Sequence, residues 1–318
     1  MTTSSTGRTV AIEELVVKLD PASARVRRIA ALTIMIVPAL GFLGAVYQVW
    51  HGAVTTTAWV LFGVMYALHM GGISIGFHRY LTHKSFTTSP AFEGVLLVCG
   101  SMGGQGPIMD WVTTHRRHHM YSDRAGDPHS PNLHGTRLRD RLRGLWHAHM
   151  PWMLSDETSK WSVFAPDILG SRRIFFYHRT YLWWVLAGLA VPALAGLAVD
   201  GGVAGAVNGL LFGGLARMFL VNQASWCVGS VAHMFGGRPF RTADNSANNW
   251  PVAVLTFGEG LQNNHHAFPS SYRLWMRRWE PDLGGWLLAL FAKLRLVGDL
   301  REPSPEAVAR RRRTPDES

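Results

Sequence analysis

The fold is decided by residues 55–83, which read TTTAWVLFGVMYALHMGGISIGFHRYLTH. Residues 55–77 carry no Asp, Glu, Lys or Arg, and a helix of about 20 apolar residues can cross the hydrocarbon core of a bilayer. His78 and His83 follow directly, and neutral imidazole is the commonest protein ligand of transition metals. The stretch therefore predicts a membrane-spanning helix with candidate metal ligands at its end.

Three further apolar stretches have the length of a membrane span, namely residues 29–50, 175–199 and 203–228. Very short turns near Gly52 and Gly201 join the first span to the second and the third to the fourth. Arg217 falls inside the fourth span, so we expect it to face the bundle interior or to mark an early end of the span. Only 16% of the 318 residues are charged, whereas a soluble domain has about 25%. We predict an all-α membrane protein with four transmembrane helices in two hairpins.

Basic residues predict which helix ends face the cytosol. The formal net charge is +10, and Lys and Arg concentrate before the first span, in the loop 79–173 and in the tail, whereas neither hairpin turn contains any. Cytosolic loops carry the excess of Lys and Arg, so both termini and the long loop are expected in the cytosol. Because the arginines flank apolar spans, we attribute the charge to lipid headgroups and topology, and we expect no nucleic-acid partner.

The remaining apolar runs, 91–102 and 283–296, are too short to span and contain charged residues. We interpret both as interfacial or re-entrant helices, which keeps every histidine cluster on one cytosolic face. The expected division is an N-terminal cytosolic segment (1–28), a membrane domain (29–300) and a disordered basic tail (301–318). Residues 78–174 and 229–300 of the membrane domain are expected to form a helical cytosolic cap that holds a histidine-rich site for two metals.

Eight histidines lie in this predicted cap or at its edge. The spacing His-x2-His-His at 115–119 places three imidazoles on one helical face, and Gln-x2-His-His at 262–266 repeats it. His78 and His83 are five residues apart, which is not one α-helical face, so we expect the helix to end there and a loosened turn to supply the second ligand. The candidate metal ligands are His78, His83, His115, His118, His119, His233, His265 and His266.

The ligand type limits the choice of metal. Structural zinc takes four ligands and often includes Cys, but the two cysteines are isolated in apolar runs and no Cys-x2-Cys occurs. Imidazole also suits iron and copper, and two irons that share these ligands would be positioned for oxygen chemistry. The carboxylates of Asp110, Asp127 and Glu259 are candidates for orienting the imidazole N–H groups, and His129 is a candidate for a place behind the ligands.

The order and spacing of these motifs resemble those of the integral-membrane fatty-acid desaturases, closest to the acyl-CoA (stearoyl, delta-9) desaturase type. The resemblance runs from about Thr55 to Leu296 and rests on GFHRYLTH (76–83), HRRHHMYSD (115–123), DPHS (127–130), AHMFG (232–236) and GEGLQNNHHAFP (258–269). It implies four transmembrane helices under a cytosolic cap that holds a non-haem di-iron centre. It also implies that the eight histidines bind two Fe2+ ions, and that two hydrogens leave a saturated acyl chain, at the delta-9 position, while O2 is reduced to water.

Three positions depart from the acyl-CoA pattern and leave the acyl carrier open. Gln262 stands where acyl-CoA members usually have histidine, and it can bind through its amide oxygen or through water. Gly229 stands where many have an asparagine that acts through water, and Thr113-Thr114 replaces an Arg-Asp pair near the CoA headgroup. The residues expected to support the centre, from behind the ligands or through water, are Gln262, Gly229, Glu259, Asp127 and His129.

The resemblance also implies an outside source of electrons, since the sequence contains neither a His-Pro-Gly-Gly haem motif nor a Rossmann fingerprint. The expected partners are a fatty-acyl substrate linked to CoA, phospholipid or acyl carrier protein, a ferredoxin or cytochrome-type donor, and the lipid bilayer. We expect a multi-pass protein of a bacterial plasma membrane with a cytosolic active site. Two alternatives are a related membrane di-iron hydroxylase or acetylenase acting on a lipid or hydrocarbon, and a membrane metal-binding or transport protein.

Overall fold

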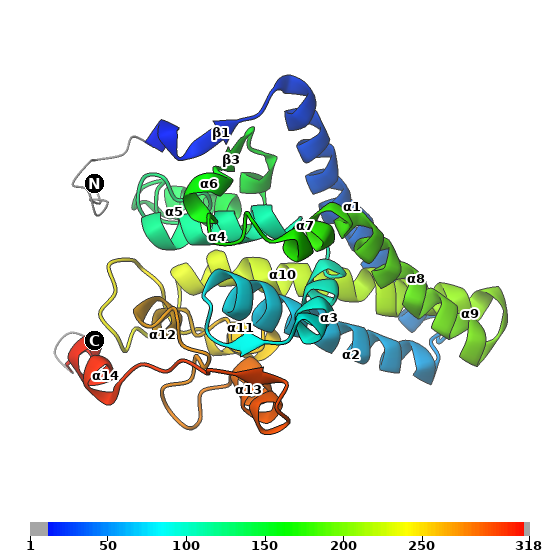
Figure 1. Cartoon of the computed structure of the whole chain (residues 1–318). Helices are drawn as coiled ribbons and strands as arrows, with labels where there is room; N and C mark the ends of the chain where they lie inside the picture. The colour runs from blue at the N-terminus through cyan, green and yellow to red at the C-terminus, as the bar shows by residue number, and fades with distance from the viewer. Residues whose placement is uncertain (1–11, 315–318) are drawn as a thin grey trace.

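The chain is mostly helical, as the computed structural model shows for residues 12–314, the part of the chain that it describes (Figure 1). Its α-helices are α1 (Pro21–Trp50), α2 (Thr56–Gly71), α3 (Pro90–Ser101), α4 (Ile108–Tyr121), α5 (Leu138–His149), α6 (Trp161–Phe164), α7 (Arg172–Arg179), α8 (Tyr181–Asp200), α9 (Gly202–Gly209), α10 (Arg217–Gly229), α11 (Trp250–Leu255), α12 (Gln262–Ala267), α13 (Leu283–Lys293) and α14 (Pro305–Arg311). Tighter or wider helical turns are η1 (Ile12–Glu14), η2 (Gly72–Thr82), η3 (Pro151–Leu154), η4 (Leu210–Ala216) and η5 (Val231–His233). Two short antiparallel strand pairs join β1 (Val16–Lys18) to β3 (Glu157–Ser159) and β2 (Thr87–Thr88) to β4 (Val297–Gly298).

Four helical segments of the described range are long and apolar enough to cross a membrane. They are Pro21–Trp50, Thr56–Thr82, Tyr181–Asp200 and Gly202–His233, which match the four predicted spans in number and order. α3 and α13 are shorter apolar helices and coincide with the two runs that the sequence marks as too short to span. The second span contains α2 and η2, and the fourth contains α9, η4, α10 and η5.

Two of these segments begin at other residues than predicted. α1 starts at Pro21 rather than at residue 29, because the Asp20 side chain accepts hydrogen bonds from Ala22 N (2.9 Å) and Ser23 N (3.1 Å) and proline suits the first helical turn. The third segment starts at Tyr181 rather than at residue 175, since residues 172–179 form the separate helix α7. The arginines of that region therefore lie outside the apolar helix α8.

The second segment runs past its predicted end at Phe77 and reaches Thr82 as the wider helix η2. A π-helix pairs each N–H with the carbonyl five residues earlier, and His83 N accordingly donates to His78 O at 3.1 Å. The predicted end of the span at Phe77 is therefore wrong, whereas the loosened turn that was expected to supply His83 is present. The extra residue per turn brings the two imidazole rings to 4.7 Å between centroids.

Hydrogen bonds join the two hairpin turns to each other. The hydroxyls of Thr55 and Thr57 donate to Asp200, each at 2.6 Å, and Asn208 Nδ2 donates to Ala53 O at 3.0 Å. These contacts connect the α1–α2 turn with the α8–α9 turn at the end of the bundle that lies away from the histidines (Figure 1). The two hairpins therefore act as one bundle.

Arg217 faces the bundle interior, which is the first of the two predicted options. Its side chain is fully buried and donates three hydrogen bonds to the backbone oxygens of Gly213, Met102 and Gly188. A buried charge is tolerable when backbone carbonyls satisfy its donors. The fourth segment consequently continues for five residues beyond the predicted end at residue 228, to His233.

The helices α4, α5, α6, α12 and α14 gather at the opposite end from the hairpin turns (Figure 1). The predicted disordered tail is wrong for residues 305–311, which form α14. The Ser304 hydroxyl accepts a hydrogen bond from Ala307 N (3.2 Å), and Ala307 and Val308 pack against the buried Phe240. Residues 1–11 of the predicted N-terminal segment and residues 315–318 of the tail lie outside the described part of the chain.

Candidate metal centre

The eight candidate histidines come from four elements that end or lie at one end of the bundle. η2 and the residue after it carry His78 and His83, and η5 carries His233. α4 carries the three histidines of 115–119 on its inner face, and the short helix α12 carries those of 265–266. Each element brings only one to three imidazoles, so the site depends on how the four elements meet.

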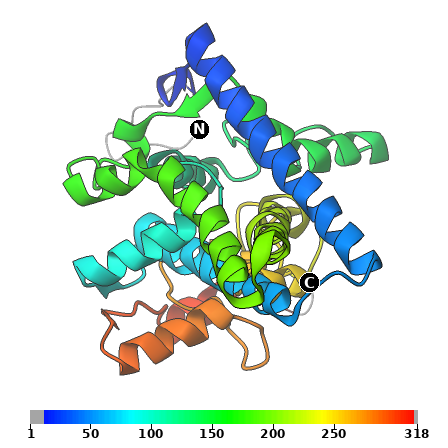
Figure 2. The same cartoon turned by 90° about the vertical axis from the view of Figure 1, so that its right-hand side faces the viewer.

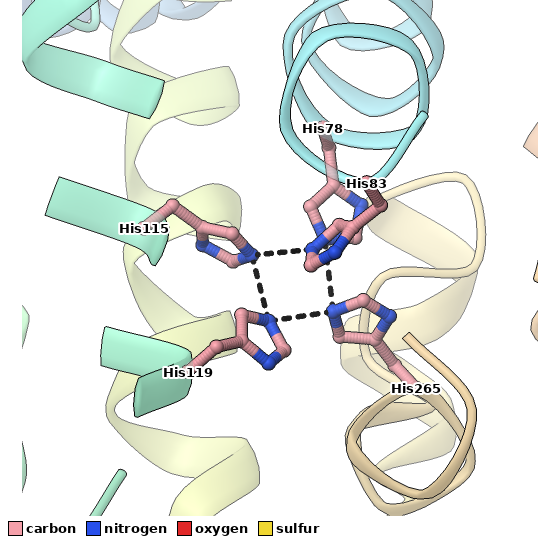
Figure 3. A group of neighbouring side chains, drawn as sticks. All are labelled: His78, His83, His115, His119 and His265. Carbon is pink, nitrogen blue, oxygen red and sulfur yellow. Dashed lines mark hydrogen bonds between the residues drawn. The ribbon is translucent and has the colours of Figure 1, made fainter. Parts of the chain in front are cut away.

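Five of these imidazoles form one group, shown in Figure 3. Four contacts of 2.9–3.2 Å between Nε2 atoms, dashed in Figure 3, link the five-histidine group in a chain that runs from His78 to His83. Two nitrogens bound at about 2.1 Å to one metal and at right angles to each other would also lie about 3 Å apart. The members of the group are His78, His83, His115, His119 and His265.

Burial favours the neutral form, which binds metals, for four of the five imidazoles. It lowers the pKa values of His83, His115, His119 and His265 well below the ordinary histidine value, and the neighbouring histidines lower them further. A neutral imidazole has one nitrogen lone pair free for a metal. These four imidazoles can therefore each offer a nitrogen lone pair to a common metal.

The other three imidazoles form the three-histidine group, His118, His233 and His266. Each has its Nδ1 atom beside an aspartate oxygen, at 3.0 Å for Asp127, 3.1 Å for Asp123 and 2.8 Å for Asp244. Each Nε2 atom is buried without a hydrogen-bond partner. A carboxylate that accepts the Nδ1 proton fixes the tautomer and leaves Nε2 free to bind a metal.

The aspartates of the three-histidine group are ionised despite their burial. The histidines that they contact lower the pKa values of all three below the usual range for aspartic acid. In return, although burial opposes protonation, Asp127 raises the pKa of His118. For His266 burial prevails over Asp244 and lowers the pKa to about 4. The predicted role of Asp127 behind a ligand agrees with this geometry.

Glu259 takes the same position behind the five-histidine group. Its carboxylate lies 2.6 Å from His78 Nδ1 and accepts hydrogen bonds from the buried Arg79 (3.1 Å) and Ser74. Arg79 also contacts Asp282 at 2.7 Å. Although burial disfavours its charge, His78 and Arg79 lower the pKa of Glu259. This carboxylate fixes the orientation of His78 and connects it to a buried ionic cluster.

Three further residues that the sequence suggests border the three-histidine group or the cavity beside it. The His129 ring stacks on His118 with 4.5 Å between centroids, and its Nδ1 atom is buried without a partner. A Cβ atom on Gly229 would lie 3.2 Å from that Nδ1 atom, so the glycine leaves room for His129. The Gln262 side chain is buried and its Oε1 atom has no partner. Asp110, by contrast, accepts a hydrogen bond from Trp161 Nε1 (3.1 Å) rather than from one of the eight histidines.

Sequence reasoning missed Asp123 and Asp244. Asp123 ends the HRRHHMYSD motif, so its proximity to the second histidine cluster was a usable signal. Asp244 lies 22 residues before His266 in an irregular segment, and no spacing rule connects the two. Asp244 reaches His266 only because the chain after η5 folds back towards α12.

A cavity of about 1140 Å³ leads to both groups. Apolar side chains of α1 line one wall of it, and His78, His115 and His118 border it on the metal side. His129, Gly229, Glu259 and Gln262 also line it. Such a volume slightly exceeds the usual range for small-molecule sites and suits a long apolar ligand.

The donor set fits two metal ions. In each group the candidate ligand atoms lie within 4.8 Å of one another, and the donors are neutral nitrogens with carboxylates behind them. Imidazole donors suit iron, copper, zinc and nickel, while carboxylate behind imidazole raises ligand basicity. The buried, unpartnered Nε2 atoms of the three-histidine group are the strongest sign that it can bind a metal, because a buried polar atom normally has a partner.

Comparison with known proteins agrees with this site. The family model described as fatty acid desaturase matches residues 55–284. A hex-5-enoyl-[acyl-carrier protein] acetylenase of Moorena producens is 41% identical over 275 residues, which cover 86% of each chain. The sn-1 stearoyl-lipid 9-desaturase of Synechocystis is 33% identical over 79% of this chain and 75% of its own. Acyl-CoA desaturase 1 of Saccharomyces cerevisiae is 33% identical over 78% of this chain and 47% of its own.

The matched region contains all eight histidines and every element that positions them, from α2 to α12. Its extent and the identity to several relatives confirm the resemblance that the histidine motifs indicate. The chain belongs to the fatty acid desaturase family of oxidoreductase enzymes.

Proposed function

We propose that this chain desaturates a saturated fatty-acyl chain with O2 at a centre of two Fe2+ ions. The observation that carries the proposal is the convergence of five and three imidazoles on the wall of one long, mostly apolar cavity. The delta-9 position is the proposed site of the double bond, and the name of the Synechocystis relative supports it.

The five-histidine group would hold one iron and the three-histidine group the other. When bound, the irons supply the activation of O2 and the removal of two hydrogens from neighbouring carbons, which no protein side chain can perform. The three-histidine group leaves more positions for other donors, and the partnerless Nδ1 of His129 and Oε1 of Gln262 are the nearest candidates, directly or through water. Gly229 contributes by leaving space for His129.

The protein itself orients the metal-binding imidazoles and the acyl chain, and it excludes bulk water. Asp123, Asp127, Asp244 and Glu259 hold four imidazoles in the tautomer whose Nε2 atom faces inward. The apolar cavity wall holds the acyl chain beside His78, His115 and His118 and keeps bulk water from the reacting carbons. Positioning alone decides which methylenes are within reach of the centre.

We further propose that the four long apolar helices span a bacterial plasma membrane, with both termini and the metal centre in the cytosol. The concentration of Lys and Arg outside the hairpin turns supports this orientation. A ferredoxin or cytochrome-type protein would deliver electrons from the cytosol. The excess of Lys and Arg in the loop 79–173 would suit an acidic donor of that kind.

Iron content and product analysis test the function together. Purified protein is expected to bind about two irons per chain, one for each histidine group, and to form double bonds when given a reductant, O2 and a stearoyl substrate. His118→Ala removes one ligand and is expected to abolish the product, whereas His51→Ala, in the hairpin turn, should keep it. A single zinc per chain, or full activity of His118→Ala, would overturn the assignment.

An acetylenase is the second candidate, because the Moorena relative, an acetylenase, covers 86% of the chain at 41% identity. Desaturation and acetylene formation both remove two hydrogens, but the acetylenase starts from a chain that already carries a double bond. Mass spectrometry of products from matched stearoyl and oleoyl substrates separates the two. An alkyne formed faster than an alkene would replace the desaturase by the acetylenase.

A further inference from the structure

One wall of the cavity is a single face of α1. The lining residues of this helix run from Ala22 to Ile34 and include Val26, Arg27 and Ala30. Twelve residue steps of α-helix extend the wall over about 18 Å. A ligand in the cavity therefore lies along the first candidate membrane span for much of its length.

The cavity opens between α1 and α8. Tyr181 and Leu182, in the first turn of α8, line it opposite α1. Val26 and Leu182 are 68% and 64% exposed, so both edges of this opening reach the outer surface of the bundle. α1 packs chiefly against η4, α10 and η3. Figure 2 shows α1 and α8 as two helices that do not cross in that view. Because both helices are candidate membrane spans, the opening would face the lipid of the bilayer.

Polar residues mark the depth of this opening in a bilayer. Ser23, Arg27 and Lys160 line the cavity at one end of the α1 wall, and Ala30 and Ile34 line the apolar continuation. Arg and Lys near the end of a span place it at headgroup level. The opening therefore runs from the headgroup layer into the acyl layer.

The charges at the polar end are mixed. Lys160 and Arg27 are accompanied by Asp110 in the cavity wall. In the adjoining strand pair, Glu157 lies opposite Lys18 and interacts with Arg117. A carrier with several phosphates, such as CoA, or an acidic carrier protein would need an excess of cations. A zwitterionic or uncharged headgroup has no such need.

We infer that the substrate is an acyl chain still esterified to a membrane glycerolipid, which enters sideways between α1 and α8 with its headgroup beside Arg27 and Lys160. This rests on the proposed desaturase function and names its substrate class. The chain then follows the α1 wall to His78, His115 and His118, without leaving its lipid.

The test supplies deuterated stearoyl chains on three carriers to the full-length, iron-loaded protein in nanodiscs with a reductant and O2. The carriers are 1-stearoyl phosphatidylethanolamine in the disc, stearoyl-CoA and stearoyl-acyl carrier protein. We expect double bonds on the intact phospholipid at a rate at least tenfold above either soluble carrier. Ala30→Trp should lower that rate at least tenfold, because Ala30 lines the opening, whereas Leu32→Trp, exposed on the same helix but off the cavity, should retain it within twofold.

Desaturation of the CoA or carrier-protein substrate while the phospholipid stays saturated would overturn the inference and leave the desaturase standing. Equal rates for Ala30→Trp and Leu32→Trp would overturn the sideways route. No product on any carrier, with two irons bound, would instead contradict the proposed function itself.

Discussion

Asp244→Asn is expected to empty the three-histidine group selectively. In the structure, Asp244 Oδ2 lies 2.8 Å from His266 Nδ1, and Oδ1 accepts a hydrogen bond from Ser246 N at 3.0 Å and another from the Ser246 hydroxyl. Both carboxylate oxygens therefore act as acceptors. Asparagine has only one acceptor oxygen and must turn its NH2 group towards one of these partners.

Either orientation of the new amide causes a loss. If the NH2 group faces His266, Nδ1 must accept, the ring proton moves to Nε2, and that nitrogen can no longer bind a metal. If the NH2 group faces Ser246, it meets a backbone N–H donor and a buried hydrogen bond is lost. Substitution of residues behind metal ligands typically costs 10- to 100-fold in metal affinity, which is about 1.4 to 2.7 kcal/mol.

The assay is iron content at a series of buffered free Fe2+ concentrations, read by mass spectrometry of the metal. One of two binding steps should weaken by about 10- to 100-fold in Asp244→Asn, while the step assigned to the five-histidine group stays unchanged. Asp299→Asn, which alters an exposed carboxylate bonded to Thr87, is the matched control and should leave both steps unchanged. Equal weakening of both steps, or of neither, would refute the separation into two sites.

Three further outcomes follow from the structure. Burial keeps several histidines neutral in the folded, metal-free chain, whereas the unfolded chain protonates them below about pH 6.5. The free energy of unfolding should therefore fall as pH decreases, by up to about 1.4 kcal/mol per pH unit for each such histidine. Thermal unfolding at pH 7.5, 6.5 and 5.5 measures this loss. Gly72→Ala should destabilise by about 1–3 kcal/mol, because its Cβ would meet the backbone of Gly100, whereas Gly63→Ala, with open space around it, should be neutral or stabilising. Glu259→Gln should cost about 3–5 kcal/mol by leaving Arg79 partly unpaired, and unchanged denaturant midpoints would contradict that.

Sequence patterns predicted the parts of the fold that depend on long signals. Each apolar stretch of 20 or more residues became a long helix, because hydropathy summed over such a length outweighs local detail. The start of α1 was missed although the signal was present, since Asp20-Pro21 is a good helix start and the following arginines obscured it. The helix α14 was missed although Ser304-Pro305 is a usable helix start, while its packing against the cluster that contains Phe240 could not be read from a local pattern.

The geometry of the first histidine pair shows where sequence reasoning stops. A five-residue spacing fits a π-turn, but whether a helix adopts one depends on its neighbours. Here the backbone of Gly72, the first residue of η2, lies so close to that of Gly100 in α3 that a side chain could not fit between them. The histidine spacing was visible in the sequence, while the packing that accompanies the wider turn was not.

The charges around the centre explain why its acids lie behind the histidines. Burial lowers the pKa of five of the eight imidazoles and so favours their neutral form. Four carboxylates contact four of the eight: Asp123, Asp127, Asp244 and Glu259. Arg79 contacts both Glu259 and Asp282, and two divalent ions would offset the negative charge that the carboxylates bring to the centre. An excess charge of either sign would be costly at this depth. Removal of a histidine therefore deletes a donor outright, whereas removal of an acid leaves the imidazole in place and weakens it as a donor, because the tautomer is no longer fixed. Histidine variants should accordingly lose metal more completely than acid variants, which is checked by comparing the iron content of His266→Ala with that of Asp244→Asn.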